Sequence, residues 1–231
     1  MHGGGGDEHT WLGTPQRPAA MARVLDHMIA AGTIAPVIVV APTFDVEPAS
    51  FDANVVTFGN ELRTDLVPAF ESSHRTYAES VTPAGLTASR THRAFGGFSM
   101  GSVTTWHVFQ TSMDYFSRFL PMSGDSWSTG QFGGRNDPTG TARALADSVQ
   151  RSGYSAEQYV LYAATGSEDI ANQNMTNQVA AMRELSDTFR FADDGCSPGV
   201  ATFHITPGNQ HDYSAATEYA YLGLPCLFPH D

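Results

Sequence analysis

The stretch HRAFGGFSMGSVTTW, residues 92–106, joins a short apolar strand to an amphipathic helix through a tight turn. The turn carries the pattern Gly-x-Ser-x-Gly, from Gly97 to Gly101. Glycine at both ends removes the Cβ atoms that would clash where a strand bends sharply into a helix. Ser99 is then expected on a strained turn, with its hydroxyl exposed at the helix N-terminus. This order of residues is typical of a nucleophile in an α/β protein.

Apolar runs alternate with helical periodicity along the rest of the chain. Strands are predicted over residues 35–42, 92–98, 118–123, 157–165 and 200–207, and the first of these, APVIVVAP, is typical of a strand buried on both faces. Helices are predicted over residues 17–31, about 62–70, 101–116, 139–152, 175–185 and from about 214, with a loop over 43–58. Pro68 is expected to disturb the second helix. The alternation predicts one domain, residues 1–231, with a mostly parallel sheet covered by helices on both faces.

Ligands of such a sheet bind outside the carboxyl ends of its strands, and this rule shortens the search for partners of Ser99. A serine hydroxyl needs an adjacent base, and His211 in PGNQHDY follows the last predicted strand. The imidazole in turn needs a carboxylate. Asp169 in ATGSEDI is the first choice, with Glu168 beside it and Asp125 in SGDSW as the rival. The order Ser99, Asp169, His211 is that of the α/β-hydrolases.

Four consecutive glycines follow His2 and offer a bare backbone close to the start of the chain. Acyl transfer from an ester passes through an oxyanion, which preorganised N–H groups must stabilise. We expect one donor from the amide of Met100, directly after the nucleophile, and the other from an HGGG-type loop, as in lipases and esterases. Gly4 is the first choice for that second donor and Gly3 the next. A flexible tag or linker is the alternative interpretation of this segment.

Composition limits the partners. The 231 residues include 24 acidic and 12 basic side chains, all twelve of them arginine, and the formal net charge of −12 would repel nucleic acid. We expect no membrane span, because no apolar run approaches about 18 residues. Cys196 and Cys226 are compatible with a disulfide or with two free thiols.

Several motifs together resemble one family over essentially the whole chain. They are HGGGGDEHTW, NELRTDLVPAFES, HRAFGGFSMGSVTTW, PMSGDSW, ATGSED, PGNQHDY and YAYLGLPCLFP. In this combination and order the chain is similar to the esterase D-like family of α/β-hydrolases, and within it to feruloyl esterase domains that act on plant cell-wall xylan.

The resemblance implies a role for each matched residue. Ser99 would be the nucleophile, Asp169 the acid and His211 the base, with Gly4 and Met100 forming the oxyanion hole. Gly3 and Trp127 would line the substrate site, although Trp127 can equally be a core residue. No metal or organic cofactor is implied. The family's usual GGHD segment is GNQHD here, so Asn209 and Gln210 change the loop ahead of the histidine.

The resemblance also predicts missing strands. In this fold the HGGG loop follows the third strand, which lies between the fourth and the fifth, yet only Met1 precedes His2 here. We therefore expect an α/β-hydrolase fold that lacks its first three strands, with five strands left and a chain truncated at its N-terminus. The open backbone edges would reduce its stability. A signal peptide would be lost by the same truncation, so secretion is expected from the family alone.

The leading functional hypothesis is a serine esterase that releases hydroxycinnamic acids from xylan through an acyl-enzyme. An acetyl xylan esterase or another short-chain carboxylesterase is the alternative within the same chemistry. A noncatalytic α/β-hydrolase-like binding module is the alternative from another class.

Overall fold

The computed structural model describes residues 1–43, 51–192, 196–197 and 199–230. Its centre is a parallel sheet of four strands in the order β3-β4-β5-β6. These strands are β3 (Ala94–Phe98), β4 (Arg118–Met122), β5 (Val160–Gly166) and β6 (Ala201–Thr206). The last four predicted strands are therefore confirmed, in sequence order across the sheet.

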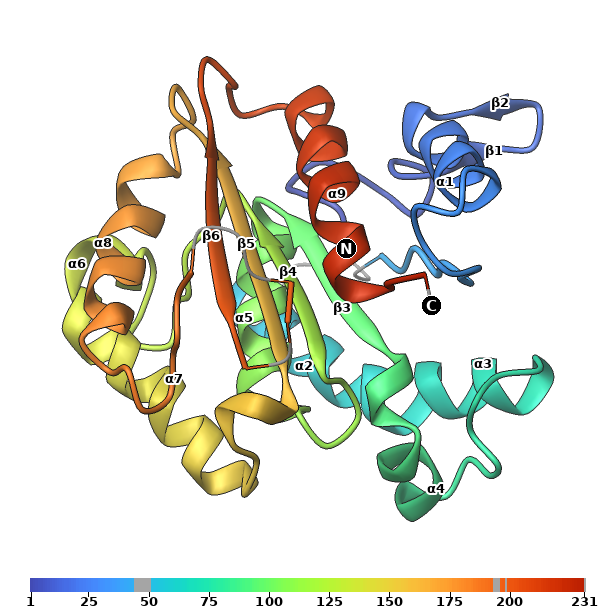
Figure 1. Cartoon of the computed structure of the whole chain (residues 1–231), viewed down its shortest axis with the longest axis horizontal. Helices are drawn as coiled ribbons and strands as arrows, with labels where there is room; N and C mark the ends of the chain where they lie inside the picture. The colour runs from blue at the N-terminus through green and yellow to red at the C-terminus, as the bar shows by residue number, and fades with distance from the viewer. Residues whose placement is uncertain (44–50, 193–195, 198, 231) are drawn as a thin grey trace.

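Helices cover both faces of this sheet (Figure 1), as the alternating pattern predicts. One face carries α5 (Met100–Thr111), α7 (Pro138–Ser152) and α8 (Asn172–Arg183). The other face carries α9 (Tyr213–Leu227), with α1 (Ala20–Ala30) packed beside it. The shorter helices are α4 (Pro83–Ala88), α6 (Gly133–Asn136), η2 (Arg90–His92) and η3 (Ala156–Gln158).

Alternation along the strands supplies two separate hydrophobic cores. Phe95, Phe119 and Leu161 point to the α5 face, whereas their neighbours Leu120 and Tyr162 point to the α9 face. Each side chain of this size stabilises the fold by about 1.5–3 kcal/mol when it is fully buried. The two cores hold the strands side by side, so the carboxyl ends of all four strands meet at one edge.

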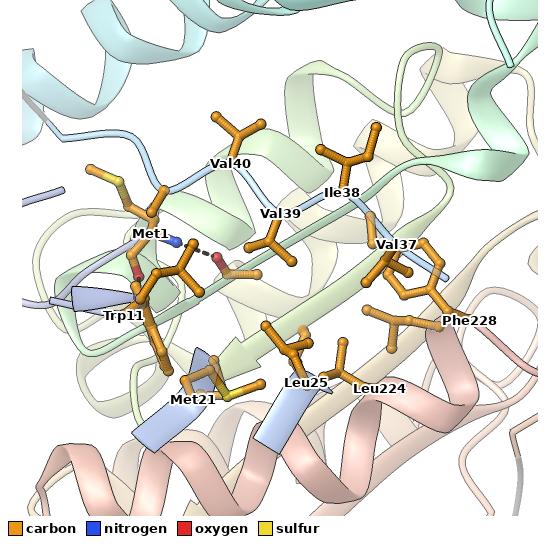
Figure 2. Close-up of a pocket in the computed structure, with 17 residues that line it drawn as sticks. Met1, Trp11, Met21, Leu25, Val37, Ile38, Val39, Val40, Leu224 and Phe228 are labelled. Atoms are coloured by element: carbon orange, nitrogen blue, oxygen red, sulfur yellow. Dashed lines mark hydrogen bonds between the residues drawn. The ribbon is translucent and has the colours of Figure 1, made fainter. Parts of the chain in front are cut away.

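Residues 35–42 do not form the predicted strand. The segment pairs with no described strand, and Ile38, Val39 and Val40 are 58%, 43% and 41% exposed. It begins near the C-terminus of α9 and ends near His2, so it runs alongside β3 in the same direction. An apolar groove separates it from β3 (Figure 2), and a strand cannot form without a partner at hydrogen-bonding distance. Within the described part of the chain, the sheet therefore has four strands rather than five.

The region after this segment is helical where a loop was predicted. Residues 44–50 of the predicted loop lie outside the described residues, but α2 (Phe51–Glu61) includes its last part, residues 51–58. The helix continues through a π-helical turn, η1 (Leu62–Leu66), into α3 (Val67–Ser73). Pro68 lies directly after the π-turn in this continuous helix, and a π-turn is one of the ways in which a helix accommodates a proline that lacks the N–H. The predicted disturbance is thus a local widening of the helix rather than a break.

Two further features were not fixed by the sequence. Residues 13–18 form a small antiparallel hairpin of β1 (Gly13–Thr14) and β2 (Arg17–Pro18). Cys196 and Cys226 form a disulfide, which decides between the two interpretations of these cysteines and ties the segment ahead of β6 to α9. Among the described helices, none combines the length and the apolar character needed to cross a lipid bilayer.

Candidate active site

Ser99 lies between β3 and α5 in the strained conformation that the glycine pattern predicts. Its φ of 56° and ψ of −116° are unusual for a residue with a side chain. A Cβ atom at Gly97 would lie 2.5 Å from the carbonyl oxygen of Gly101, so the turn needs glycine there. The Ser99 N–H donates to the carbonyl of Met122 at 2.9 Å, which fixes the turn to β4.

His211 reaches the nucleophile from the loop after β6. Its Nε2 lies 2.9 Å from Ser99 Oγ, and its ring packs against Phe98 with centroids 4.7 Å apart. The two residues that depart from the family pattern hold this loop in place. The Asn209 carbonyl accepts from the Glu168 N–H at 3.1 Å, and Gln210 donates to the Glu168 carboxylate at 3.4 Å.

Asp169 completes the hydrogen-bonded series from the loop after β5. Its Oδ1 accepts from His211 Nδ1 at 2.8 Å and from the Ala171 N–H at 2.7 Å, and its side chain is fully buried. Burial alone would raise the pKa of Asp169, but the hydrogen bonds from His211 and Ala171 outweigh it and hold the pKa below its usual value. Asp169 is therefore ionised, His211 Nδ1 carries the proton, and Nε2 is free to accept a proton from Ser99.

The rival carboxylates lie elsewhere. Asp125 is buried and accepts from the Gly134 N–H at 2.8 Å and from Asn174 Nδ2 at 3.3 Å, which places it in the packing between β4, α6 and α8. Glu168 faces solvent beside Gln210. Of the three candidates, only Asp169 contacts the imidazole in this geometry.

The second carboxylate oxygen of Asp169 faces buried hydroxyl groups. Asp169 Oδ2, Ser123 Oγ and the Tyr219 hydroxyl are all buried without a hydrogen-bond partner among the described residues. The nearby Ser123 hydroxyl nevertheless contributes to the lowered pKa of Asp169. Ser123 has a φ of 53°, so a second strained serine stands at the end of β4, beside the site.

The glycine loop, residues 3–6, lies against Ser99. A Cβ at Gly3 would lie 3.1 Å from Ser99 Cβ, and one at Gly4 would lie 3.5 Å from Met100 Cγ. The Gly3 N–H is already engaged, because it donates to the Tyr213 hydroxyl at 2.8 Å. The amides of Gly4 and Met100 bond to no other described residue. The geometry therefore favours this pair over Gly3 as donors to an oxyanion.

Tyr213 was missed by the sequence reasoning, although it stands two residues after His211 in the quoted motif PGNQHDY. Nothing in the local pattern reveals that its hydroxyl meets residue 3, which is 210 positions away. Its aromatic neighbours Phe98 and Trp11 are also distant in sequence, at 115 and 202 positions. Their ring centroids lie 5.0 and 5.7 Å from that of Tyr213.

Trp127 lies on the loop after β4, half-buried, with its ring 5.1 Å from that of Phe132. A small hollow beside it is lined by Val103 and His107 of α5 and by Ser126 and Ser128. Phe132 is 45% exposed, so this aromatic pair reaches the surface at the carboxyl edge of the sheet.

Three or more His, Cys, Asp or Glu side chains come together at no point of the described chain in a way that could hold a metal ion. The candidate site consists of an activated hydroxyl, an imidazole, a buried carboxylate and two free amides. This set can transfer an acyl group from an ester through a covalent intermediate.

Known proteins resemble this chain in sequence and in structure. No family model matches the chain. The chain is 41% identical to endo-1,4-beta-xylanase Y of Acetivibrio thermocellus over 228 residues. This aligned region is 99% of the chain but only 20% of that protein. The chain therefore spans about a fifth of the length of this curated relative.

Among solved structures, this chain covers a larger share of the proteins that it matches. A serine-to-alanine mutant of the feruloyl esterase module from Clostridium thermocellum, complexed with sinapinate, matches with a TM-score of 0.85 and 39% identity, covering 100% of this chain and 76% of that module. A ferulic acid esterase from the anaerobic fungus Anaeromyces mucronatus matches at a TM-score of 0.62 and 17% identity over 96% of this chain and 75% of that one, which supports the fold alone.

Proposed function

Because the chain belongs to the family of feruloyl esterase modules, within the α/β-hydrolases, we propose that it is a serine carboxylic-ester hydrolase that releases hydroxycinnamic acids from xylan. The observation that carries the proposal is the unbroken series of hydrogen bonds from Ser99 through His211 to Asp169. A structural role for these three side chains would not require the strained backbone of Ser99.

Acylation follows from the positions of the atoms. The Ser99 oxygen attacks the ester carbonyl carbon while His211 Nε2 takes the hydroxyl proton. The imidazolium that forms is stabilised by the ionised carboxylate of Asp169. As the tetrahedral intermediate collapses, the same Nε2 proton passes to the sugar oxygen, the carbon–oxygen bond of the ester breaks, and an acyl-enzyme remains.

Deacylation repeats these steps with water as the nucleophile. His211 takes a proton from the water molecule, and Ser99 receives it back when the acid is released. In both halves the negative oxygen would lie between the amides of Gly4 and Met100. Loss of one such donor typically costs about 3–4 kcal/mol of transition-state stabilisation.

The aromatic acyl group is proposed from two kinds of support. One similar structure holds sinapinate, and the curated relative is a xylanase. In this chain, Trp127 and Phe132 offer aromatic surface on the loop after β4. We assign Trp127 to the acyl site and Gly3 to the wall beside Ser99.

The proposed place of action is outside the cell. Xylan is an extracellular polymer, and the disulfide between Cys196 and Cys226 is of the kind that persists in oxidising compartments. The net charge of −12 is compatible with a neutral polysaccharide ester as substrate and disfavours nucleic acid as a partner.

The test is burst kinetics with a chromogenic hydroxycinnamate ester. We expect one equivalent of the alcohol to be released rapidly, and the burst to disappear in Ser99→Ala but not in Ser72→Ala, which changes an exposed serine of α3. The ratio of kcat/KM for feruloyl and acetyl esters then reports the acyl group, and a ratio below one would favour a short-chain esterase. If a fluorophosphonate probe fails to label Ser99, the protein is a noncatalytic module.

A further inference from the structure

The glycine loop is held from a distant part of the chain. Gly3 bonds in two directions, since its N–H donates to the Tyr213 hydroxyl at 2.8 Å and its carbonyl accepts from the Gly6 N–H at 3.1 Å. The His2 ring bonds to the same carbonyl, with Nδ1 at 2.7 Å. Among these contacts, only the bond to Tyr213 connects the loop to the C-terminal half of the chain.

Tyr213 is itself firmly placed. It is the first residue of α9, directly after the N-cap Asp212 and two residues after His211. Its ring packs against Phe98 of β3 and against Trp11. Burial raises the pKa of its hydroxyl, so this group stays protonated at neutral pH. A neutral hydroxyl accepts the Gly3 N–H without placing a negative charge beside the position of the oxyanion.

We propose that Tyr213 is a positioning residue for the oxyanion hole, and that its hydroxyl turns the Gly3 amide away from the substrate and leaves the Gly4 amide directed at it. This inference rests on the proposed esterase function. The Tyr213 hydroxyl links the loop that carries His211 to the glycine loop that carries Gly4. His211 and the oxyanion donors therefore keep fixed positions relative to Ser99.

The space around the loop supports this role. A Cβ at Gly6 would lie 3.0 Å from the Tyr213 hydroxyl and 3.0 Å from His2 Cβ, so the loop is packed closely around that oxygen. Gly4, in contrast, is exposed, and a Cβ there would meet only Met100 within 4 Å. The loop is thus fixed at Gly3 and Gly6 and open at Gly4, the residue that would face the substrate, and at its neighbour Gly5.

The test is Tyr213→Phe, which keeps the ring between Phe98 and Trp11 and removes only the acceptor. Tyr221→Phe, an exposed tyrosine of the same helix, is the matched control. We expect Tyr213→Phe to lower kcat for an aryl hydroxycinnamate ester about tenfold with little change in KM. We also expect it to weaken binding of a trifluoromethyl ketone transition-state analogue by the same factor, and to leave the affinity for free ferulate unchanged.

Each outcome decides one question. Unchanged kcat in Tyr213→Phe would overturn the inference, and so would an equal loss of affinity for the ketone and for ferulate, because that pattern indicates general disruption of the site. An inactive wild-type chain would instead refute the proposed esterase function. Thermal unfolding of both variants separates these results from a loss of fold.

Discussion

The replacement Asp169→Asn tests most directly the geometry of the hydrogen bonds that run from Ser99 through His211 to Asp169. The His211 Nδ1–H and the Ala171 N–H both donate to the same oxygen, Oδ1. An asparagine that keeps its carbonyl oxygen at this point retains both hydrogen bonds, and its NH₂ group then faces the Ser123 hydroxyl. His211 keeps its proton on Nδ1, so Nε2 can still accept the proton of Ser99. The variant therefore loses the negative charge without losing the tautomer.

The expected loss of rate follows from that charge. An imidazolium and a carboxylate with centres about 4 Å apart attract by about 4 kcal/mol at an effective dielectric constant near 20. This energy corresponds to about 10³-fold in rate, and the amide dipole of asparagine recovers part of it. We expect kcat/KM to fall by about 10²–10³-fold in Asp169→Asn. A wrong tautomer costs about 10⁴-fold in serine proteases.

The assay is kcat/KM for an aryl hydroxycinnamate ester at neutral pH, with Asp169→Ala and Asp125→Asn alongside. Asp169→Ala leaves the imidazole without a partner and should lose about 10⁴-fold, whereas Asp125→Asn should keep full activity. Equal losses in Asp169→Asn and Asp169→Ala would refute the reasoning, because the asparagine would then be presenting its NH₂ group to His211.

Three further predictions concern stability. Replacing Cys196 and Cys226 by serine opens a loop with a sequence separation of 30 residues and should lower the free energy of unfolding by about 3–4 kcal/mol, measured by urea titration. Burial raises the pKa of Asp125, so its ionisation above about pH 4 opposes folding, and Tm should fall less in Asp125→Asn than in the wild type as the pH rises above about 4. Burial also lowers the pKa of the Met1 α-amino group to about 5 in the groove beside β3, so the charged form of this group opposes folding at pH 7. An apolar extended segment added ahead of Met1 should raise Tm by more than a proline-rich segment of equal length, because both remove the charge but only the first has the N–H groups to pair with β3.

The last of these predictions follows from the way that Met1 pairs with β3. The Met1 nitrogen donates to the Gly96 carbonyl at 2.6 Å (Figure 2). The Met1 carbonyl accepts from the Phe98 N–H at 3.2 Å, so the two bonds together are those of one parallel pair. The groove continues along β3 from this point, between β3 and residues 37–41. An apolar segment added ahead of Met1 is therefore expected to extend the same ladder.

The predictable part of the fold and site depends on short-range patterns. The sequence Gly-x-Ser-x-Gly after an apolar run predicts the turn at Ser99, and the topology of parallel strands brings Asp169 and His211 to the same edge. Residues 35–42 were predicted wrongly because a β-branched run shows the preference of a segment but not whether a neighbouring strand is present. The π-turn at 62–66 and the contact between Tyr213 and Gly3 depend on packing, which no local pattern reveals.

The arrangement of these contacts separates the site from the open edge of the sheet. Ser99 is anchored toward β4, through its N–H to Met122, and the next turn of α5 is anchored there as well, since Ser102 Oγ donates to the Gly124 carbonyl at 2.7 Å. The base and the acid come from the loops after β6 and β5, on the far side from the groove. Changes in the groove should therefore alter stability more than kcat. The glycine loop is the exception, because Met1 and His2 lie directly between the groove and the oxyanion donors.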